Sequence, residues 1–204
     1  MLSQSLQTDV SRETSEALEH YLQLLKKWSP KINLVAPNTL ADAKTRHIED
    51  SLQLLALAPE DAKLWADLGS GGGFPGLAVA IAAKQARPDL IFHLVESDQR
   101  KAVFLRTVSR ETSTPVTVHA ERIEVLPPLS ADILSARALA PLSKLFGYVH
   151  RHRKSDGVAL LMKGGRYAEE VADAERNWAF RAETVPSKTS QDAIVLKIGE
   201  LTHV

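Results

Sequence analysis

The 204-residue sequence contains no cysteine, and aromatic residues make up only 5% of it. Without a thiol the chain cannot form a disulfide scaffold, a thiolate metal site or a cysteine nucleophile. Lysine and arginine together number 25, as do aspartate and glutamate, so the formal net charge is zero. This balance excludes a protein that coats nucleic acid by bulk charge, while it leaves room for a local basic patch.

Long apolar runs are also missing, because charged residues interrupt every hydrophobic stretch well before the roughly 18 residues that a membrane span needs. Residues 1–9 are polar, unlike the apolar core of a signal peptide. Hydrophobic residues still make up 44% of the chain, which is enough to bury a core. We expect a soluble, cytoplasmic monomer without membrane contact, built from one domain and an appendage.

Helical patterns precede any strand pattern. Apolar residues recur at three-and-four spacing between Ser11 and Trp28, with Ser11 as a candidate cap and Pro30 as the predicted end of the helix. A second helical pattern runs from Leu40 to Leu57 after an irregular connection. Residues 1–60 are therefore predicted to form a helical extension that packs on the remainder.

In residues 61–204, short apolar runs alternate with helical patterns. This alternation predicts an α/β fold, a mostly parallel Rossmann-like sheet with helices on both faces. Two late runs, Trp178–Thr184 and Ile194–Ile198, predict further strands at the far edge of the sheet, antiparallel if a hairpin-like return joins them. Residues 61–204 are thus predicted to form the ligand-binding core.

A glycine-rich turn, residues 67–76, follows the first predicted strand and fits two patterns. Gly71, Gly73 and Gly76 have the spacing of the dinucleotide fingerprint. The acid-plus-glycines loop of adenosylmethionine-dependent methyltransferases is matched by Asp67, Gly69, Gly71 and Gly73. The position of Asp67 at the strand end favours the second pattern, because its carboxylate is expected to take the ammonium of a methionine moiety directly or through water.

Two later strand ends offer further contacts to an adenosine. Glu96 lies 20 residues beyond Gly76, where a carboxylate can accept both ribose hydroxyls. Asp98 is the alternative ribose contact, or otherwise the acid at the start of the next helix. After the third predicted strand, the backbone of Ile123 and the carboxylate of Glu124 are expected to meet the adenine, unless they form a plain helical turn.

Several polar residues are candidates for the substrate side of the cleft. Arg137, at the end of the fourth strand, is expected to hold the cofactor's carboxylate or a phosphate or base of the substrate, with a surface arginine as the alternative. The candidate RNA contacts are Arg46, His47, Asp50, Ser51 and Lys163. Arg46 and Asp50 equally fit a role in pinning the N-terminal helices to the sheet, and His47 equally fits a hydrogen-bonded interface histidine. Lys163 equally fits a solvated loop. The densest basic cluster, residues 144–154, either neutralises phosphate or is ordinary surface.

The chain shows no convincing nucleophile-and-base constellation, no P-loop and no metal-ligand cluster. It does contain four separated motifs, which are Trp28–Leu34, Arg46–Ser51, the loop Asp67–Gly76 with its Phe74-Pro75-Gly76 ending, and Ser135–Ala138. With these motifs the chain resembles the small-subunit ribosomal RNA guanine-N7 methyltransferase family, also called the glucose-inhibited division protein B family. Ser29 stands where asparagine is commoner in the first motif.

The resemblance implies a class I methyltransferase fold with a seven-stranded sheet, S-adenosylmethionine as cofactor, and methylation of N7 of one guanine in the decoding-region loop of 16S ribosomal RNA. By position it implies cofactor contacts at Gly69, Phe74, Ile123, Glu124 and Arg137. Guanine N7 has a lone pair and no proton, so in-line transfer needs alignment more than a general base, and Arg137 is expected to position the reactants. The zero net charge predicts an assembled or partly assembled ribosomal particle as the substrate.

The residues alone leave two other functions open. One is a dehydrogenase that uses the fingerprint at Gly71–Gly76, with Glu96 on the ribose. The other is a ribosome-associated binding module that keeps a cofactor pocket without turnover.

Overall fold

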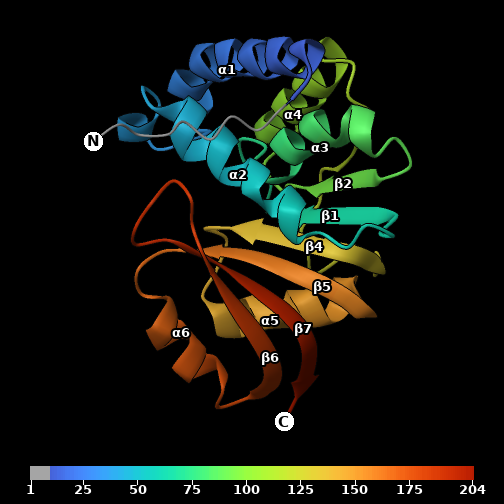
Figure 1. The fold of residues 1–204 in the computed structure, drawn as a ribbon, viewed down its shortest axis with the longest axis vertical. Coiled ribbons are helices and arrows are strands. Elements are labelled where there is room, and N and C mark those ends of the chain that lie inside the picture. Colours follow the sequence, from blue (N-terminus) through green and yellow to red (C-terminus); the bar gives the residue numbers. More distant parts are fainter. Residues whose placement is uncertain (1–9) are drawn as a thin grey trace.

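A seven-stranded sheet forms the centre of the molecule in the computed structural model, which describes residues 10–204 (Figure 1). The strands are β1 (Leu64–Leu68), β2 (Ile91–Val95), β3 (Thr117–His119), β4 (Ala131–Arg137), β5 (Arg153–Lys163), β6 (Trp178–Pro186) and β7 (Ile194–His203). Their order is β3-β2-β1-β4-β5-β7-β6. The first five are parallel, whereas β7 is antiparallel to both β5 and β6. The predicted α/β fold with a late antiparallel pair is confirmed.

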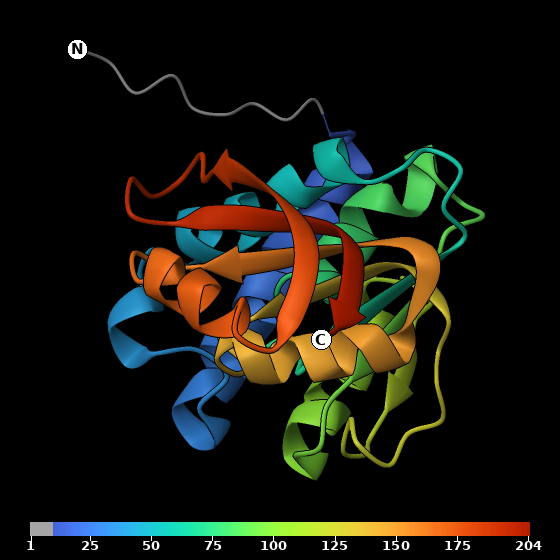
Figure 2. The ribbon, with the colours of Figure 1, turned by 90° about the horizontal axis from the view of Figure 1, so that it is seen from below.

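Helices cover both faces of this sheet. They are α1 (Arg12–Ile32), α2 (Asp50–Leu52), α3 (Gly76–Ala86), α4 (Gln99–Glu111), α5 (Leu142–His152) and α6 (Tyr167–Ala174), with the short helical segments η1 (Pro37–Thr39), η2 (Lys44–Glu49) and η3 (Gln53–Leu57). Figure 1 shows α1, α3 and α4 on one side of the sheet and α5 on the other. In the view from below, α5, α6, β6 and β7 come forward and α1 lies behind them (Figure 2). No helix within residues 10–204 is long and apolar enough to cross a membrane.

Helix α1 begins as predicted but ends later. The Ser11 hydroxyl accepts a hydrogen bond from the Thr14 amide at 3.2 Å, which caps the helix. Pro30 lies inside the helix, and the turn closes at Asn33, whose φ is +50°. A proline so near the end removes only one helical hydrogen bond, and asparagine tolerates the left-handed conformation that terminates a helix. The prediction that Pro30 ends the helix is therefore wrong.

The second predicted helix, Leu40–Leu57, is not continuous. A π-helical segment, one α-helical turn and a 3₁₀ segment follow one another from Lys44 to Leu57. Each change of winding rotates the next side chains around the axis, because the number of residues per turn differs. The segment thereby buries Ile48 and Leu54 while it directs Asp50 towards the loop between β6 and β7.

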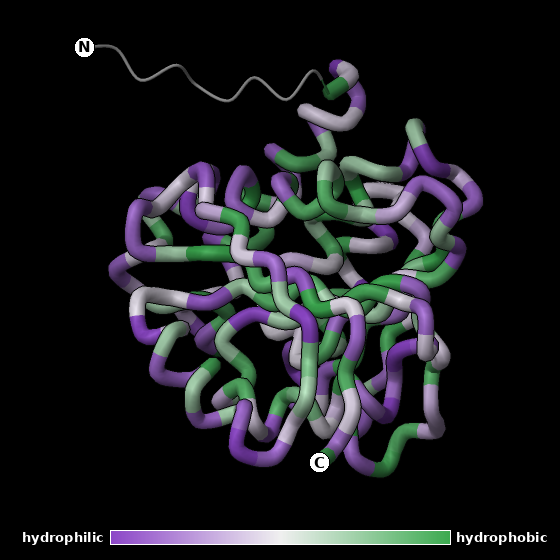
Figure 3. The backbone as a smooth tube through the Cα atoms, turned by 60° about the horizontal axis from the view of Figure 1, so that its bottom comes forward, coloured by the Kyte–Doolittle hydropathy of each residue, from purple (hydrophilic) through white to green (hydrophobic). Residues whose placement is uncertain are grey.

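Apolar side chains join the helical extension to the sheet. Leu18, Tyr21 and Leu25 of α1 form one buried cluster with residues of α3 and α4, including Phe104. A second buried cluster lies between α5 and the strands β4, β5 and β7. Figure 3 shows many hydrophobic stretches in the middle of the molecule, whereas hydrophilic residues prevail on its outer loops. The extension thus forms one wall over the carboxyl ends of the strands.

Candidate functional site

A cleft of about 680 Å³ opens where β1, β2 and β4 end. Parallel α/β sheets bind ligands at this edge, because the loops after the strands meet there. The predicted site residues that line it are Arg46, His47, Gly69, Gly71, Phe74, Glu96, Ile123, Glu124 and Arg137. The structure therefore brings together residues from widely separated parts of the chain.

The loop after β1 has a backbone that only glycine adopts easily. Gly69, Gly71 and Gly73 have φ values of +67°, +54° and +94°. A Cβ on Gly69 would press against the side chain of Leu139 across the cleft. Gly73 does not line the cleft, and a Cβ there would collide with the hydroxyl of Tyr21 beneath the loop. Gly69 and Gly71 thus keep the cleft open, whereas Gly73 allows the loop to lie close to α1.

Glu96 connects the glycine loop to the end of β2. Its Oε2 accepts a hydrogen bond from the Gly71 amide at 2.8 Å, and its Oε1 accepts one from the Asp98 amide at 2.7 Å. Each carboxylate oxygen has a second lone pair, so Glu96 can still accept two donors from a ligand. Asp98 instead caps α4 by accepting from the Arg100 and Lys101 amides. The hydrogen bond from the Arg100 side chain, together with these amides, lowers the pKa of Asp98. Of the two candidate ribose contacts, only Glu96 lines the cleft.

Ile123 and Glu124 form the side of the cleft next to α5. Glu124 Oε1 accepts a hydrogen bond from the Tyr148 hydroxyl at 2.5 Å, and this bond lowers the pKa of the carboxyl group. Tyr148 also lines the cleft. The carboxylate is therefore oriented and ready to accept from an exocyclic amine.

Asp67 lies under the glycine loop and does not line the cleft. It is fully buried, and its Oδ1 accepts a hydrogen bond from the Ser135 hydroxyl at 2.6 Å. Burial raises the pKa of Asp67 to about 6. Direct contact with a methionine ammonium does not fit this position, whereas the predicted contact through water stays a prediction, because Asp67 Oδ2 has no hydrogen-bond partner among residues 10–204. The backbone carbonyl of Asp67 accepts from the Ser70 hydroxyl at 3.1 Å, which ties the end of β1 to the glycine loop.

Arg137 lines the cleft at the end of β4. Its guanidinium carbon lies 5.1 Å from the ring centroid of Phe74, which is stacking distance for a cation and an aromatic ring. Nη1 donates to the Arg46 carbonyl at 3.4 Å and lies 3.9 Å from Asp50 Oδ2. The Phe74 ring is in turn stacked on Tyr21 at 5.2 Å. The guanidinium plane is therefore held from several sides.

His47 lines the same cleft as a neutral ring. Its Nε2 lies 2.8 Å from the Thr39 hydroxyl, which donates its own proton to the Ala36 carbonyl at 2.7 Å. The ring must therefore donate through Nε2, which leaves Nδ1 as an acceptor, and no partner for Nδ1 lies among residues 10–204. Burial, with Arg137 and Arg46 nearby, lowers the pKa of His47 to about 4.

Asp50 joins the helical extension to the loop between β6 and β7. Its Oδ1 accepts hydrogen bonds from Gln53 Nε2 at 2.8 Å and from the hydroxyls of Ser187 and Thr189 at 3.0 and 2.7 Å. The Lys188 amide donates to Gln53 Oε1 at 3.1 Å. Asp50 was predicted as an RNA contact, but its Oδ1 is occupied by these hydrogen bonds within the protein.

Two other predicted RNA contacts, Ser51 and Lys163, also form hydrogen bonds within the protein. Ser51 is fully buried and donates to the His47 carbonyl at 2.5 Å, so the prediction of RNA contact for it is wrong. The Lys163 side chain is 8% exposed, and its Nζ donates to the Ala140 carbonyl at 2.9 Å and to Glu170 at 2.7 Å. Lys163 therefore does not project freely from a solvated loop.

A second cavity, of about 450 Å³, adjoins the cleft and shares Arg137, Ala138 and Leu139 with it. Its other lining residues are Asp50, Gln53, Ala140, Pro141, Met162, Lys163, Gly164, Arg166, Glu170, Ser187, Ala193 and Ile194. The cavity thus lies between the helical extension, the ends of β4 and β5, α6 and the β6–β7 loop.

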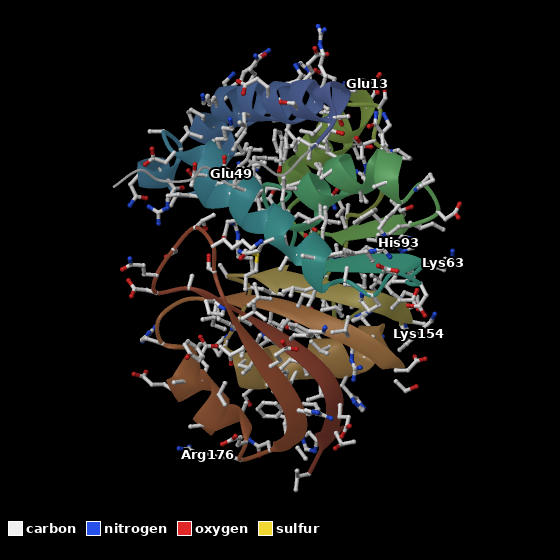
Figure 4. The ribbon with its side chains drawn as sticks, viewed as in Figure 1. Glu13, Glu49, Lys63, His93, Lys154 and Arg176 are labelled. Carbon is white, nitrogen blue, oxygen red and sulfur yellow. The ribbon has the colours of Figure 1, made fainter. Side chains whose placement is uncertain are left out.

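Part of the basic cluster at residues 144–154 is engaged in the fold, and its role in neutralising phosphate stays a prediction. His152 is fully buried and donates through Nε2 to the Ile123 carbonyl at 3.0 Å. Lys154 pairs with Asp132. Figure 4 shows Lys154 where β5 begins, whereas the cleft lies where the parallel strands end. Most of the cluster's charge is thus distant from the cleft or engaged in the fold.

Sequence reasoning missed several residues that shape the site. Thr39 and Tyr148 line the cleft, and Tyr21 supports its floor by donating a hydrogen bond to the Gly72 carbonyl. Tyr21 was visible only as an apolar position on the first helix. The β6–β7 loop carried no signal, because its bonds to Asp50 connect residues far apart in the chain.

A family model described as GidB, rRNA small subunit methyltransferase G, matches residues 14–195. The ribosomal RNA small subunit methyltransferase G of Ruegeria pomeroyi is 50% identical over 196 residues, which cover 96% of each chain. The protein of the same name from Paracoccus denitrificans is 50% identical over 195 residues, covering 95% of this chain and 98% of its own.

Solved methyltransferase structures have the same fold. The O-methyltransferase TomG from Streptomyces achromogenes, solved in complex with SAM, matches with a TM-score of 0.59 and 14% identity, over 96% of this chain and 93% of its own. A SAM-dependent methyltransferase from Aquifex aeolicus matches with a TM-score of 0.59 and 11% identity, over 91% of this chain and 97% of its own. At these identities the likeness concerns the fold alone.

Proposed function

Because the chain belongs to the rRNA small subunit methyltransferase G family, we propose that it transfers a methyl group from S-adenosylmethionine to N7 of a guanine in 16S ribosomal RNA. The observation that carries this proposal is the cleft itself. Its left-handed glycine loop and the Glu96 carboxylate lie together at the carboxyl ends of β1 and β2, within a chain that matches the family over residues 14–195.

The lining residues fit S-adenosylmethionine. Gly69 and Gly71 leave open the space that a Cβ would narrow, so the methionine part can approach the backbone there. Glu96 has two unused lone pairs for the ribose hydroxyls. The Ile123 backbone and the Glu124 carboxylate are assigned to the adenine ring and its amine. Each of these contacts is compatible with the hydrogen bonds that the same group already makes within the protein.

When bound, S-adenosylmethionine supplies a methyl group already activated on its sulfonium. Guanine N7 has a lone pair and no proton to lose, so the protein's task is to align the base. We assign this positioning role to Arg137, whose guanidinium is fixed by Phe74 and by Asp50. His47 stays neutral near pH 7, because its pKa lies at about 4, and it adds no further cation beside Arg137.

The finer proposal concerns the form of the substrate. We propose one guanine of the decoding-region loop, presented by an assembled or partly assembled small subunit to a monomeric, cytoplasmic enzyme. The formal net charge of zero supports this substrate, because it provides no bulk attraction to naked RNA. Arg46, exposed at the rim of the cleft, is the proposed RNA contact.

Methyl transfer from labelled S-adenosylmethionine to small subunits that lack the modification tests the function. Digestion to nucleosides should yield labelled 7-methylguanosine. A different labelled nucleoside, or cofactor binding without transfer, would contradict the proposal. Comparison with deproteinised RNA tests the finer part, since equal activity on both substrates would exclude the requirement for a particle.

A further inference from the structure

We propose that the second cavity receives the target guanine, swung out of its RNA, and that Glu170 recognises the edge of the base that carries N1–H and the 2-amino group. This inference rests on the proposed function, because it identifies the acceptor side of the same site. Enzymes that modify a base inside structured RNA or DNA commonly extrude it into such a pocket and read its Watson–Crick edge.

The cavity has the right place and size. Arg137, Ala138 and Leu139 form a wall common to the cavity and the cofactor cleft, so a base in the cavity lies next to that cleft. Its volume of about 450 Å³ is within the usual range of small-molecule sites.

The lining suits a flat, polar-edged ring. Leu139, Pro141, Met162 and Ile194 provide apolar surface, and the side chains of Met162 and Ile194 are almost fully buried. Stacking on apolar groups is how proteins hold an unstacked base. The polar groups are left to meet the edges of the ring.

The two edges of guanine call for groups of opposite charge, and the cavity contains both cations and carboxylates. Guanine offers acceptors at N7 and O6, which arginine and lysine recognise. Arg137 belongs to the common wall and can therefore donate to O6, on the side where methylation takes place, while the lone pair of N7 stays free to take the methyl group. The opposite edge offers donors and calls for a carboxylate, and the cavity contains two, Asp50 and Glu170.

Glu170 is the carboxylate that remains available. Asp50 Oδ1 already accepts three hydrogen bonds and Asp50 Oδ2 lies beside Arg137. Glu170 Oε2 accepts from the Leu142 amide at 2.8 Å and from Lys163 Nζ at 2.7 Å. These two bonds fix the orientation of the carboxylate, and within residues 10–204 no hydrogen bond reaches Oε1. A fixed carboxylate with a free oxygen selects guanine over adenine, because adenine N1 is an acceptor and would be repelled.

Glu170→Gln separates recognition from structure. The amide oxygen of glutamine can still accept from Leu142 and Lys163, but its amino group confronts the donors of guanine. We expect kcat/KM for small subunits to fall about 10- to 100-fold, as for loss of one good base contact. The affinity for S-adenosylmethionine, measured by calorimetry, should stay unchanged. The matched control is Glu169→Gln, on the same helix but exposed and outside the cavity, which should leave both quantities unchanged.

Subunits reconstituted with inosine at the target position provide the second readout, because inosine lacks the 2-amino group. The wild-type enzyme should be less active on inosine than on guanine. The loss of activity caused by Glu170→Gln, relative to the wild type, should be clearly smaller on inosine than on guanine. Equal losses on both bases, or an unchanged kcat/KM in Glu170→Gln, would overturn the proposal. If the wild-type enzyme bound the cofactor but left guanine N7 unmethylated, the proposed function itself would fail, which is a different result.

Discussion

The buried carboxyl group of Asp67 makes the stability of the protein depend on pH. Its pKa is about 6 in the folded chain, above the 3.8 of an exposed aspartate, because burial disfavours the charge. Between these two values the folded state holds the proton more tightly than the unfolded state does. The contribution of Asp67 to the free energy of unfolding therefore falls as pH rises from about 4 to about 6.

Asp67→Asn tests this dependence. Asparagine has no proton to lose and can keep its bond from Ser135, so the variant should gain stability relative to the wild type as pH rises. The difference between the two free energies of unfolding should change by up to about 3 kcal/mol between pH 4 and pH 7. Urea unfolding at several pH values measures it, and a constant difference would show that Asp67 has no raised pKa.

Arg137→Lys probes the difference between charge and shape at the cleft. Lysine keeps the positive charge but has no planar group to stack on Phe74. Since misalignment of reactants strongly slows transfer, we expect kcat/KM to fall about 100-fold, with a smaller loss of cofactor affinity. Steady-state methylation and calorimetry measure the two effects. Arg176→Lys, at an exposed position away from the cleft (Figure 4), should behave as wild type.

Sequence patterns predicted most residues of the cleft but not the direction of every side chain. Gly69, Glu96 and Arg137 were found because they stand at strand ends, which meet at one edge of a parallel sheet. Asp67 and Ser51 also belong to recognisable motifs, yet they point into the interior. Burial of this kind depends on neighbours from distant segments, which spacing along the chain does not reveal.

Among the structural elements, the turn between β1 and α3 depends most on glycine. Gly69→Ala puts a Cβ against Leu139 in a left-handed backbone, which costs about 1–2 kcal/mol for the backbone alone. We expect lower stability and weaker binding of S-adenosylmethionine, measured by urea unfolding and by calorimetry.

Gly147→Ala is the matched control within helix α5. Nothing lies within 4 Å of a Cβ at Gly147, so alanine there should stabilise the helix by roughly 0.5–1 kcal/mol and leave cofactor binding unchanged. If Gly69→Ala also bound S-adenosylmethionine normally, the glycine loop would not be the site of the cofactor.

Strands were easier to predict than the N-terminal helical segments. Strands β1 and β2 coincide closely with their apolar runs, because buried parallel strands are apolar on both faces. Between Lys44 and Leu57 the helical spacing was recognised, but the π and 3₁₀ windings were not. Asp50 and Gln53, which follow the π-helical segment, bond to the β6–β7 loop, and such contacts with distant segments can override local propensity.

At the scale of the whole molecule, α1 is built into the core. Leu25 is fully buried in the cluster that α1 forms with α3 and α4. We therefore predict that residues 1–60 and 61–204, although distinct in pattern, unfold together. Leu25→Ala should lower the free energy of unfolding by about 2–5 kcal/mol, the usual effect of removing a buried leucine side chain.

Two tryptophans on opposite faces of the sheet provide the measurement. Trp28 lies on α1 and Trp178 begins β6. The third tryptophan, the fully buried Trp65, is replaced by phenylalanine in both variants. Variants that keep only Trp28 or only Trp178 should then unfold at the same urea concentration, and Leu25→Ala should shift both transitions equally. A shift confined to Trp28 would mean that the extension unfolds independently of the sheet.

The wall formed by Arg137, Ala138 and Leu139 has a consequence for inhibitor design. One molecule can span two adjoining cavities with a common wall. In such a molecule a linker takes the place of the reacting sulfonium and joins an adenosine to a purine. Once the adenosine is seated, the tethered purine is present at a high effective concentration, so the affinity of the linked molecule can exceed that of either fragment by orders of magnitude. Such a bivalent ligand would recognise the pair of cavities rather than the cofactor cleft alone.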